Sequence, residues 1–170
     1  MEELELTYLA KELPPKLKES PSKELLDIYI PSSARHPILR IRKSGSKYEI
    51  TKKHPVKDGD ASHQLETTIP ITEEEFKELN QLSGKRVEKV RYYYKENGLL
   101  YEVDAFKGDL AGLVLIDVEF DSAKAKNEFI PPSWCLIEVI QEEFIAGGML
   151  CGKKYSDIEA KLSTFGYKKF

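Results

Sequence analysis

Pairs of like charges, each separated by one apolar residue, recur along this sequence. On a β-strand the residues i and i+2 lie on the same face, where like charges repel each other. A single pair of this kind is typical of a solvated strand face, but five pairs in one chain indicate that charged faces are gathered to bind a ligand. The three acidic and two basic pairs are Glu3–Glu5, Glu102–Asp104, Asp117–Glu119, Arg40–Arg42 and Lys89–Arg91.

Each kind of pair has its own chemistry. Two carboxylates on one strand face lie roughly 7 Å apart and can converge on a hard divalent cation such as Mg²⁺ or Mn²⁺, which prefers oxygen ligands. Arginine presents a fork of N–H donors that matches phosphate oxygens, and lysine adds a point charge. Together the two kinds of pair predict a site for a polyanion with its metal, such as a polyphosphate or a nucleotide.

The charged pairs lie in segments where apolar and polar residues alternate, a pattern typical of strands. Turn signals at 43–46 and 96–98 separate neighbouring segments at hairpin spacing, which favours antiparallel pairing. The predicted strands cover residues 2–9, 25–30, 37–43, 47–53, 64–69, 86–95, 99–106, 112–120 and 135–140.

The opposite faces of these strands are apolar, as in the segments 4–8 and 114–118. Apolar faces need cover from helices or from other strands. We therefore expect the apolar faces to pack outward under helices, and the charged faces to line the wet interior of a closed barrel.

Two short helices are predicted from capping boxes, in which a hydroxyl and a carboxylate accept hydrogen bonds from the free amides of the first turn. One box is formed by Thr72 with Glu75, and the other by Ser156 with Glu159.

A third helix is predicted to begin near Asp121, which can cap it. A further helical segment over residues 142–150 contains Gly147 and Gly148, which weaken a helix interior. With these helices the predicted fold class is α+β, dominated by strands.

Length, charge and cysteine usage limit the other possibilities. The 170 residues predict one domain over 1–170, and 29 acidic against 26 basic residues give a net charge of −3, which argues against general affinity for nucleic acid or an anionic membrane. The acidic start and the lack of a long apolar run predict a cytoplasmic protein. Cys135 and Cys151 have no ligand motif around them, so we expect reduced thiols.

Several motifs follow one another in order along the chain. It opens with Glu3-Leu4-Glu5-Leu6-Thr7 and closes with Trp134 ahead of Glu138-Val139. The segments between them are Tyr29, Leu39-Arg40-Ile41-Arg42, Thr51-Lys52-Lys53, Glu66, Lys89-Val90-Arg91, Glu102-Val103-Asp104 and Asp117-Val118-Glu119. In this order the sequence resembles the CYTH family, also called triphosphate tunnel metalloenzymes.

The sequence departs from the family pattern at three positions. Thr7 stands where the opening Glu-x-Glu-x-Lys strand has a lysine, and Ser62 and Gln64 stand where the family often has arginine and glutamate. These departures weaken the assignment of a substrate.

The resemblance implies an antiparallel barrel of about eight strands that is closed or nearly closed, with a few flanking helices. It implies a small-molecule triphosphate bound along a tunnel, and metal-dependent attack of water on a phosphoryl group with Mg²⁺ or Mn²⁺. Relatives act on inorganic tripolyphosphate, thiamine triphosphate or nucleoside triphosphates, and a few make cyclic AMP.

The resemblance also implies a role for individual residues. Tyr29 and Lys89 resemble a catalytic pair in which the lysine lowers the pKa of the phenol or positions the attacking water, although Tyr29 could equally just pack at the barrel mouth. The implied metal ligands are Glu3, Glu5, Asp117 and Glu119, with Glu66 and Asp104 of second rank. The implied phosphate ligands are Arg40, Arg42, Lys53, Lys89 and Arg91.

Other functions stay open at this point. A polyphosphate- or nucleotide-binding protein with weak turnover is an alternative because of Thr7 and Gln64, and an adenylate cyclase or a sandwich module with a polar face are others. A homodimer is also left open. The histidines have no ligand spacing and are expected to be solvated, and Trp134 is expected in the core; the histidines are His36, His54 and His63.

Overall fold

The alternating segments form nine strands within residues 2–170, the part of the chain that the computed structural model describes. Most bounds agree with the prediction, although β2 begins earlier than expected and β3 later. The strands are β1 (Glu2–Ala10), β2 (Ser22–Ile30), β3 (Leu39–Ser44), β4 (Lys47–Pro55), β5 (His63–Ile71), β6 (Lys85–Glu96), β7 (Leu99–Phe106), β8 (Val114–Phe120) and β9 (Cys135–Glu138).

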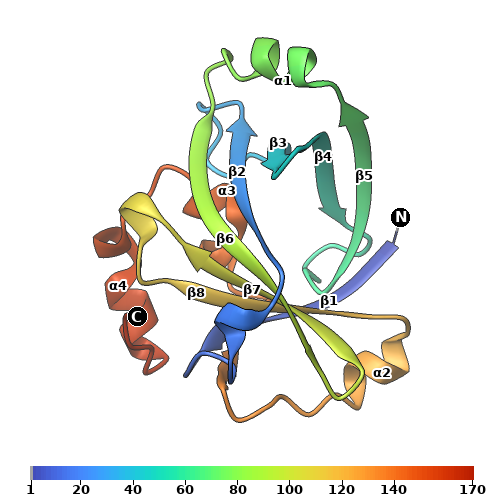
Figure 1. Ribbon diagram of the computed structural model, residues 1–170, viewed down its shortest axis with the longest axis vertical. Coiled ribbons are helices and arrows are strands. Elements are labelled where there is room, and N and C mark those ends of the chain that lie inside the picture. Colours follow the sequence, from blue (N-terminus) through green and yellow to red (C-terminus); the bar gives the residue numbers. More distant parts are fainter. Residues whose placement is uncertain (1) are drawn as a thin grey trace.

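Eight of these strands close into an antiparallel barrel (Figure 1). The strand order is β5-β4-β3-β2-β6-β7-β8-β1, and β1 pairs with β5 to complete the ring, with Glu3 opposite Gln64. The far end of β1 pairs with β9, which lies outside the ring, through Tyr8 opposite Glu138. The predicted closed barrel of about eight strands is confirmed.

Short helices connect and cover the strands. The capping box at α1 is confirmed: Thr72 Oγ1 accepts from Glu75 N at 3.2 Å, and Glu75 accepts from Thr72 N at 2.7 Å. Among residues 2–170 no helix has the length and apolar composition needed to cross a membrane. The helices are α1 (Glu73–Leu79), α2 (Ala123–Asn127), α3 (Gly147–Leu150) and α4 (Tyr155–Thr164), with 3₁₀ turns at Leu17–Glu19, Gly108–Leu110 and Glu143–Ile145.

The prediction of the cap at α4 is wrong. The helix begins at Tyr155, so Asp157 rather than Glu159 occupies the third position, and its carboxylate accepts from Lys154 N at 2.8 Å. Ser156 lies inside the first turn, because burial of Tyr155 and Ile158 sets where the helix docks and starts it two residues earlier.

The cap of α2 is also displaced by one residue. Ser122, not Asp121, is the N-cap, and its hydroxyl accepts from Ala125 N at 3.1 Å. The predicted helix over 142–150 is broken into a 3₁₀ turn and α3, as expected from Gly147 and Gly148 in its middle.

The outward strand faces carry two apolar clusters. Ile28 and Ile41 pack under Phe76 of α1, and Tyr8 and Val118 pack with Trp134 in a larger aromatic cluster on the other side of the barrel. Trp134 is therefore a core residue, as predicted. For these faces the expectation of an outward apolar layer is confirmed.

The inward faces change character along the barrel. Thr7 is followed on the same face by Leu9, Asp104 by Phe106, and Asp117 is preceded by Leu115. These apolar residues form a cluster with Leu150 of α3 and with Ile158 and Leu162 of α4. The expectation that apolar faces pack outward under helices does not cover α3 and α4, which pack on inward-facing apolar residues at one end of the barrel.

The remaining residue types agree largely with expectation. Cys135 and Cys151 are free thiols. His54 is exposed, but His63 Nε2 lies 3.1 Å from Glu2 and His36 Nδ1 lies 3.5 Å from Glu143, so these two are half-buried beside carboxylates and not simply solvated.

Candidate functional site

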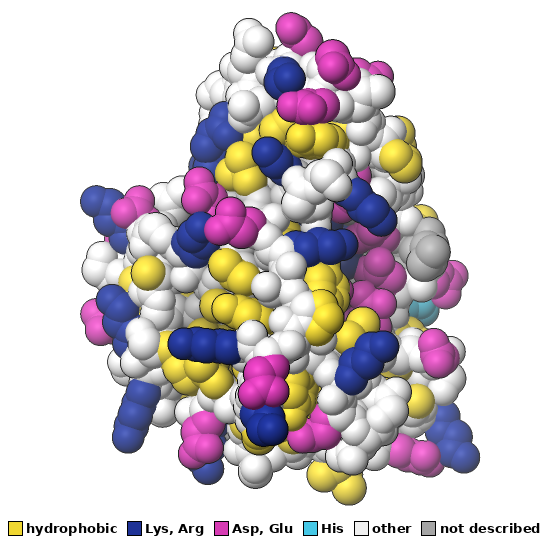
Figure 2. Space-filling view, viewed as in Figure 1, with side chains coloured by type: hydrophobic (Ala, Val, Ile, Leu, Met, Phe, Trp, Pro, Cys, Tyr) yellow, Lys and Arg dark blue, Asp and Glu magenta, His cyan; other side chains and the backbone are white. Residues whose placement is uncertain are grey.

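The barrel encloses a cavity of about 560 Å³ lined by side chains from all eight ring strands, and seven of these strands contribute charged residues. The two residues of each charged pair share one face of their strand, and this face points into the barrel. Figure 2 shows a hollow in whose wall acidic side chains gather, with basic side chains beside it. One lining residue from each strand, β1 to β8 in order, is Glu3, Tyr29, Arg40, Lys53, Glu66, Arg91, Asp104 and Asp117.

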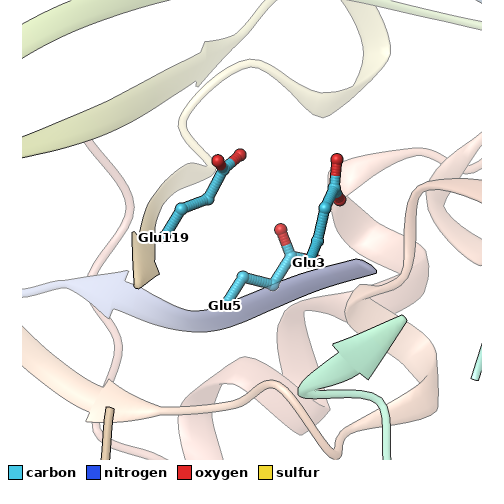
Figure 3. A group of neighbouring side chains, drawn as sticks. All are labelled: Glu3, Glu5 and Glu119. Carbon is cyan, nitrogen blue, oxygen red and sulfur yellow. The ribbon is translucent and has the colours of Figure 1, made fainter. Parts of the chain in front are cut away.

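Three carboxylates come together on one side of the cavity. Glu3 and Glu5 lie on β1, and Glu119 lies on β8 directly opposite Glu5. Each offers an oxygen within 4.8 Å of the others (Figure 3). We call Glu3, Glu5 and Glu119 the acidic triad.

Burial and mutual repulsion act on the acidic triad. Burial raises the pKa of Glu5 to about 7, with Lys53 partly offsetting the rise and Asp117 adding to it. Burial likewise raises the pKa of Glu119, and its neighbours Glu102 and Glu3 add to the rise. Burial and the neighbouring carboxylates therefore disfavour the charged forms of Glu5 and Glu119, and a cation would favour them.

Lys53 reaches into this acidic side from β4. Its Nζ lies 2.5 Å from Glu3, 3.3 Å from Glu66 and 3.7 Å from Glu5. Burial lowers the pKa of Lys53, but Glu5 and Glu3 outweigh it and raise that pKa above its ordinary value, so the ammonium stays charged.

The opposite side of the cavity is basic and held in place by buried aspartates. Asp27 accepts two hydrogen bonds from Arg42, at 2.6 and 2.7 Å. Asp104 accepts two from Arg91, at 2.7 and 2.6 Å, and also pairs with Lys89. Bidentate pairs of this kind fix the direction of a guanidinium.

Two aspartates on the neighbouring strands β7 and β8, Asp104 and Asp117, have pKa values shifted in opposite directions. Burial raises the pKa of Asp104, but Arg91 and Lys89 outweigh it and lower that pKa to about 2. Burial raises the pKa of Asp117, Asp104 adds to the rise, and Arg91 only partly offsets it. Thr7 donates a hydrogen bond to Asp117 at 2.6 Å.

Arg40 is the exception on the basic side. It lines the cavity, and its buried Nε has no hydrogen-bond partner among residues 2–170. No ion pair found within that range involves Arg40, whereas Arg42, Lys53, Lys89 and Arg91 all have a carboxylate partner. A guanidinium that has no carboxylate partner and a free buried Nε–H is ready to bind an anion.

Tyr29 lies at the apolar end of the cavity and is buried. Burial raises the pKa of its phenol, and Arg40 is the largest opposing influence. Lys89 is held by Asp104 and lies opposite Leu25, not Tyr29, in the β2–β6 register, so a role of Lys89 toward the phenol stays a prediction.

Comparison with known proteins adds an independent line of evidence. Residues 2–129 match the family model of the CYTH domain. An inorganic triphosphatase from Nitrosomonas europaea is 41% identical over 107 residues, which cover 62% of this chain and 68% of the relative.

The chain belongs to the CYTH domain family. A crystal structure of an inorganic triphosphatase matches this CYTH protein with a TM-score of 0.64 and 31% identity, covering 88% of this chain and 93% of the other. A Hippeastrum protein with a described triphosphatase activity matches with a TM-score of 0.50 and 13% identity over 96% of this chain and 88% of the other, a likeness in fold alone.

CYTH triphosphatases imply a divalent cation, and the residues of this CYTH protein fit one. The acidic triad supplies hard oxygen donors that converge, in the chemistry that Mg²⁺ and Mn²⁺ prefer. Burial and the neighbouring carboxylates raise the pKa of Glu5 to about 7, so an added cation would favour its charged form. The ammonium of Lys53, 2.5 Å from Glu3, already places one positive charge beside the acidic triad.

The CYTH fold brings all of the predicted site residues to one cavity, but divides them into groups. Glu3, Glu5 and Glu119 form the acidic triad, with Glu66 beside them through Lys53. Asp104 instead pairs with Lys89 and Arg91, away from the triad.

Other residues in the cavity wall, or directly behind it, were not predicted. Asp27 lies on the inward face of β2 two residues before Tyr29, so extending the inward face of that strand would have found it. Glu49 and Glu102 also line the cavity. Gly147 lies against Tyr29, so close that a Cβ there would come 2.1 Å from the phenol oxygen, and no local sequence signal predicts this contact.

The three residues that depart from the family pattern lie in different places in this CYTH protein. Thr7 and Gln64 both line the cavity. Ser62 does not: its hydroxyl donates to Asp60 at 2.7 Å and accepts from Lys126 at 2.5 Å, so it holds the β4–β5 loop.

Proposed function

We propose that this CYTH protein is a divalent-metal-dependent hydrolase of inorganic triphosphate. The observation that carries the proposal is one cavity with an acidic triad on one side and the unpaired Arg40 on the other. A cation and a polyphosphate need these two surfaces facing each other. The 41% identity to an inorganic triphosphatase supports the choice of substrate.

Glu3, Glu5 and Glu119 would hold the cation, with Asp117 and Glu66 close enough in the cavity wall to support it. A bound Mg²⁺ or Mn²⁺ would supply Lewis-acid polarisation of phosphoryl oxygens and neutralise their charge. All of these ligands are carboxylates, so a soft metal is not favoured.

The basic side binds and orients the phosphate chain. Arg40 binds first because it has no carboxylate to leave. Arg42 and Arg91 are fixed by Asp27 and Asp104, so their remaining donors are preorganised for the charge that builds up on the transferred phosphoryl group.

Lys89 and Tyr29 remain the proposed catalytic pair, in a changed form. Burial lowers the pKa of Lys89, with Asp104 opposing this and Arg91 adding to it. Lys89 therefore positions the attacking water and does not act on the phenol. Tyr29, with a raised pKa, stays protonated and can donate a hydrogen bond to a phosphate oxygen.

One observation favours a second candidate, a protein that binds polyphosphate with weak turnover. The hydroxyl of Thr7 donates its hydrogen bond to Asp117 at 2.6 Å. Because Thr7 is neutral, the cavity has no charged donor for phosphate at this position. A neutral donor is about half as strong as a charged one.

A phosphate-release assay separates the two candidates. It compares tripolyphosphate, thiamine triphosphate, ATP and pyrophosphate with Mg²⁺ or Mn²⁺, and with excess EDTA. We expect tripolyphosphate to be hydrolysed fastest, with turnover lost in EDTA and lost in Glu119→Gln. Glu88→Gln serves as the matched control, because Glu88 is exposed on the outside of β6. Turnover that persists in EDTA would contradict the metal requirement.

A further inference from the structure

Lys53 differs from the other basic residues of the cavity in its partners. Its ammonium lies among Glu3, Glu5 and Glu66, at 2.5, 3.7 and 3.3 Å. Two of these carboxylates belong to the acidic triad. Lys89 and Arg91 instead pair with Asp104, on the opposite side. Lys53 is thus a cation placed against the carboxylates that would hold the divalent metal.

The charges of this cluster do not balance. The acidic triad carries three carboxylates, and Lys53 brings one ammonium to two of them. At a given distance a doubly charged ion gains about twice the Coulomb energy of a singly charged one. Lysine is a hydrated point charge on a flexible stem, so it can neutralise the carboxylates in part and can also leave them.

The register gives Lys53 a second place to bind. Arg40 on β3 lies directly opposite Thr51 on β4, and Lys53 is the next inward residue of β4. Diagonal neighbours on one sheet face lie roughly 7–8 Å apart, within reach of a lysine side chain. A phosphate bound at the unpaired Arg40 would therefore lie within reach of Lys53.

We propose that Lys53 is a built-in counter-ion, which holds the place of the divalent cation in the ligand-free cavity and moves to the triphosphate when the cation binds. The inference rests on the proposed function. Its consequence is that Lys53 weakens cation binding to the free protein. A triphosphate that draws Lys53 away strengthens cation binding, and by linkage the cation strengthens triphosphate binding by the same factor.

The first test measures Mn²⁺ affinity in the absence of triphosphate, from the electron paramagnetic resonance signal of free Mn²⁺. Lys53→Met keeps the length of the stem and removes the charge. We expect it to bind Mn²⁺ at least ~10-fold more tightly than the wild type, because a nearby positive charge is gone. Lys52→Met is the matched control, since Lys52 is exposed on the outward face of the same strand, and its affinity should be unchanged.

The direction of this change separates the proposal from structural damage. A distorted site binds metal more weakly, so unchanged or weaker Mn²⁺ binding by folded Lys53→Met would overturn the proposal. Adding Glu5→Gln to Lys53→Met should remove the gain, which would place the Mn²⁺ at the acidic triad. If the gain survives Glu5→Gln, the ion binds elsewhere and the proposal is wrong.

A second test avoids any substitution at position 53, so it does not depend on the stability of such a variant. In protein labelled at lysine Cε, addition of Mg²⁺ without triphosphate should shift the Lys53 NMR signal as its ammonium leaves the carboxylates, and Glu5→Gln should abolish the shift. A Lys53 signal that does not respond to Mg²⁺ contradicts the proposal. Tripolyphosphate hydrolysis by the wild type is measured alongside: its absence would reject the proposed function, whereas hydrolysis without the Lys53 effects rejects only this inference.

Discussion

Thr7 Oγ1 lies 2.6 Å from Asp117 Oδ1, and the two residues stand directly opposite each other on β1 and β8. The neutral hydroxyl thus bonds to a carboxylate whose pKa is raised by burial and by Asp104. A charged donor at this position would face both Asp117 and the phosphate chain.

Thr7→Lys should therefore tighten the binding of tripolyphosphate several-fold, because a charge-assisted hydrogen bond is about twice as strong as a neutral one. The measurement is calorimetric titration with tripolyphosphate in the absence of metal, followed by steady-state rates in Mg²⁺. The control is Thr67→Lys, which adds the same charge on the exposed outer face of β5. Equal effects of the two variants would mean that only net charge matters and that position 7 does not contact the phosphate.

The pKa of Glu5 gives stability a defined pH dependence. The carboxyl loses its proton near pH 4.5 when unfolded but near 7 when folded, so between these values the folded state binds more protons. Stability therefore falls as pH rises through this window. Each pKa unit corresponds to about 1.4 kcal/mol, which limits the loss to about 3.5 kcal/mol.

Glu5→Gln should flatten this dependence and leave the ligand-free protein as stable as the wild type, or more so, near pH 7.5. Urea unfolding in EDTA from pH 5 to 8 measures it. Glu88→Gln, on the outer surface, should keep the wild-type slope. A variant that loses stability at every pH would show that Glu5 is needed as a partner of Lys53. Combining Glu5→Gln with Glu3→Gln should abolish turnover as well.

The pair of Asp27 and Arg42 is buried, with both hydrogen bonds under 2.8 Å, at 2.6 and 2.7 Å. Removing one charge of such a pair leaves the other uncompensated, so Asp27→Asn should lower the free energy of unfolding by about 3 kcal/mol. Glu24→Gln is the control, because its pair with Lys107 is exposed and should change stability by less than about 0.5 kcal/mol. Similar small losses in both variants would contradict the importance of burial.

Gly147 leaves no room for a side chain beside Tyr29, since a Cβ would lie 2.1 Å from the phenol oxygen. Gly147→Ala should therefore destabilise the protein by about 1–3 kcal/mol through overpacking. Tyr29→Phe removes the oxygen in question, so the double variant should lose less stability than the sum of the single changes. Thermal unfolding of the four proteins measures this. Strict additivity would mean that the strain falls on another contact.

The sequence alone predicted the barrel and most of the charged side chains in its interior. Alternation is a local property, because successive side chains of a strand point to opposite faces whatever the strand pairs with. Charged pairs such as Glu3–Glu5 and Lys89–Arg91 therefore had to share a face with each other. The match of motif order to the CYTH family gave the fold and the expected chemistry.

Tertiary structure decided which of these charges meet. Lys53 contacts Glu3 only because β1 pairs with β5 to close the ring, two strands that are distant along the chain. Asp104 was expected beside the metal ligands, but the β6–β7 register puts it opposite Arg91. Such contacts depend on long-range pairing, which no local pattern encodes.

Tertiary structure also decided where the charged cavity ends. Leu9 and Leu115 continue the inward faces of Thr7 and Asp117, and in the sequence they look like ordinary strand residues. They become buried because α3 and α4 pack against them at one end of the barrel, with Leu150 and Leu162 in the same cluster. The docking of a helix is set by burial of apolar area from distant segments, and it is this packing that gives Tyr29 its buried place beside Gly147.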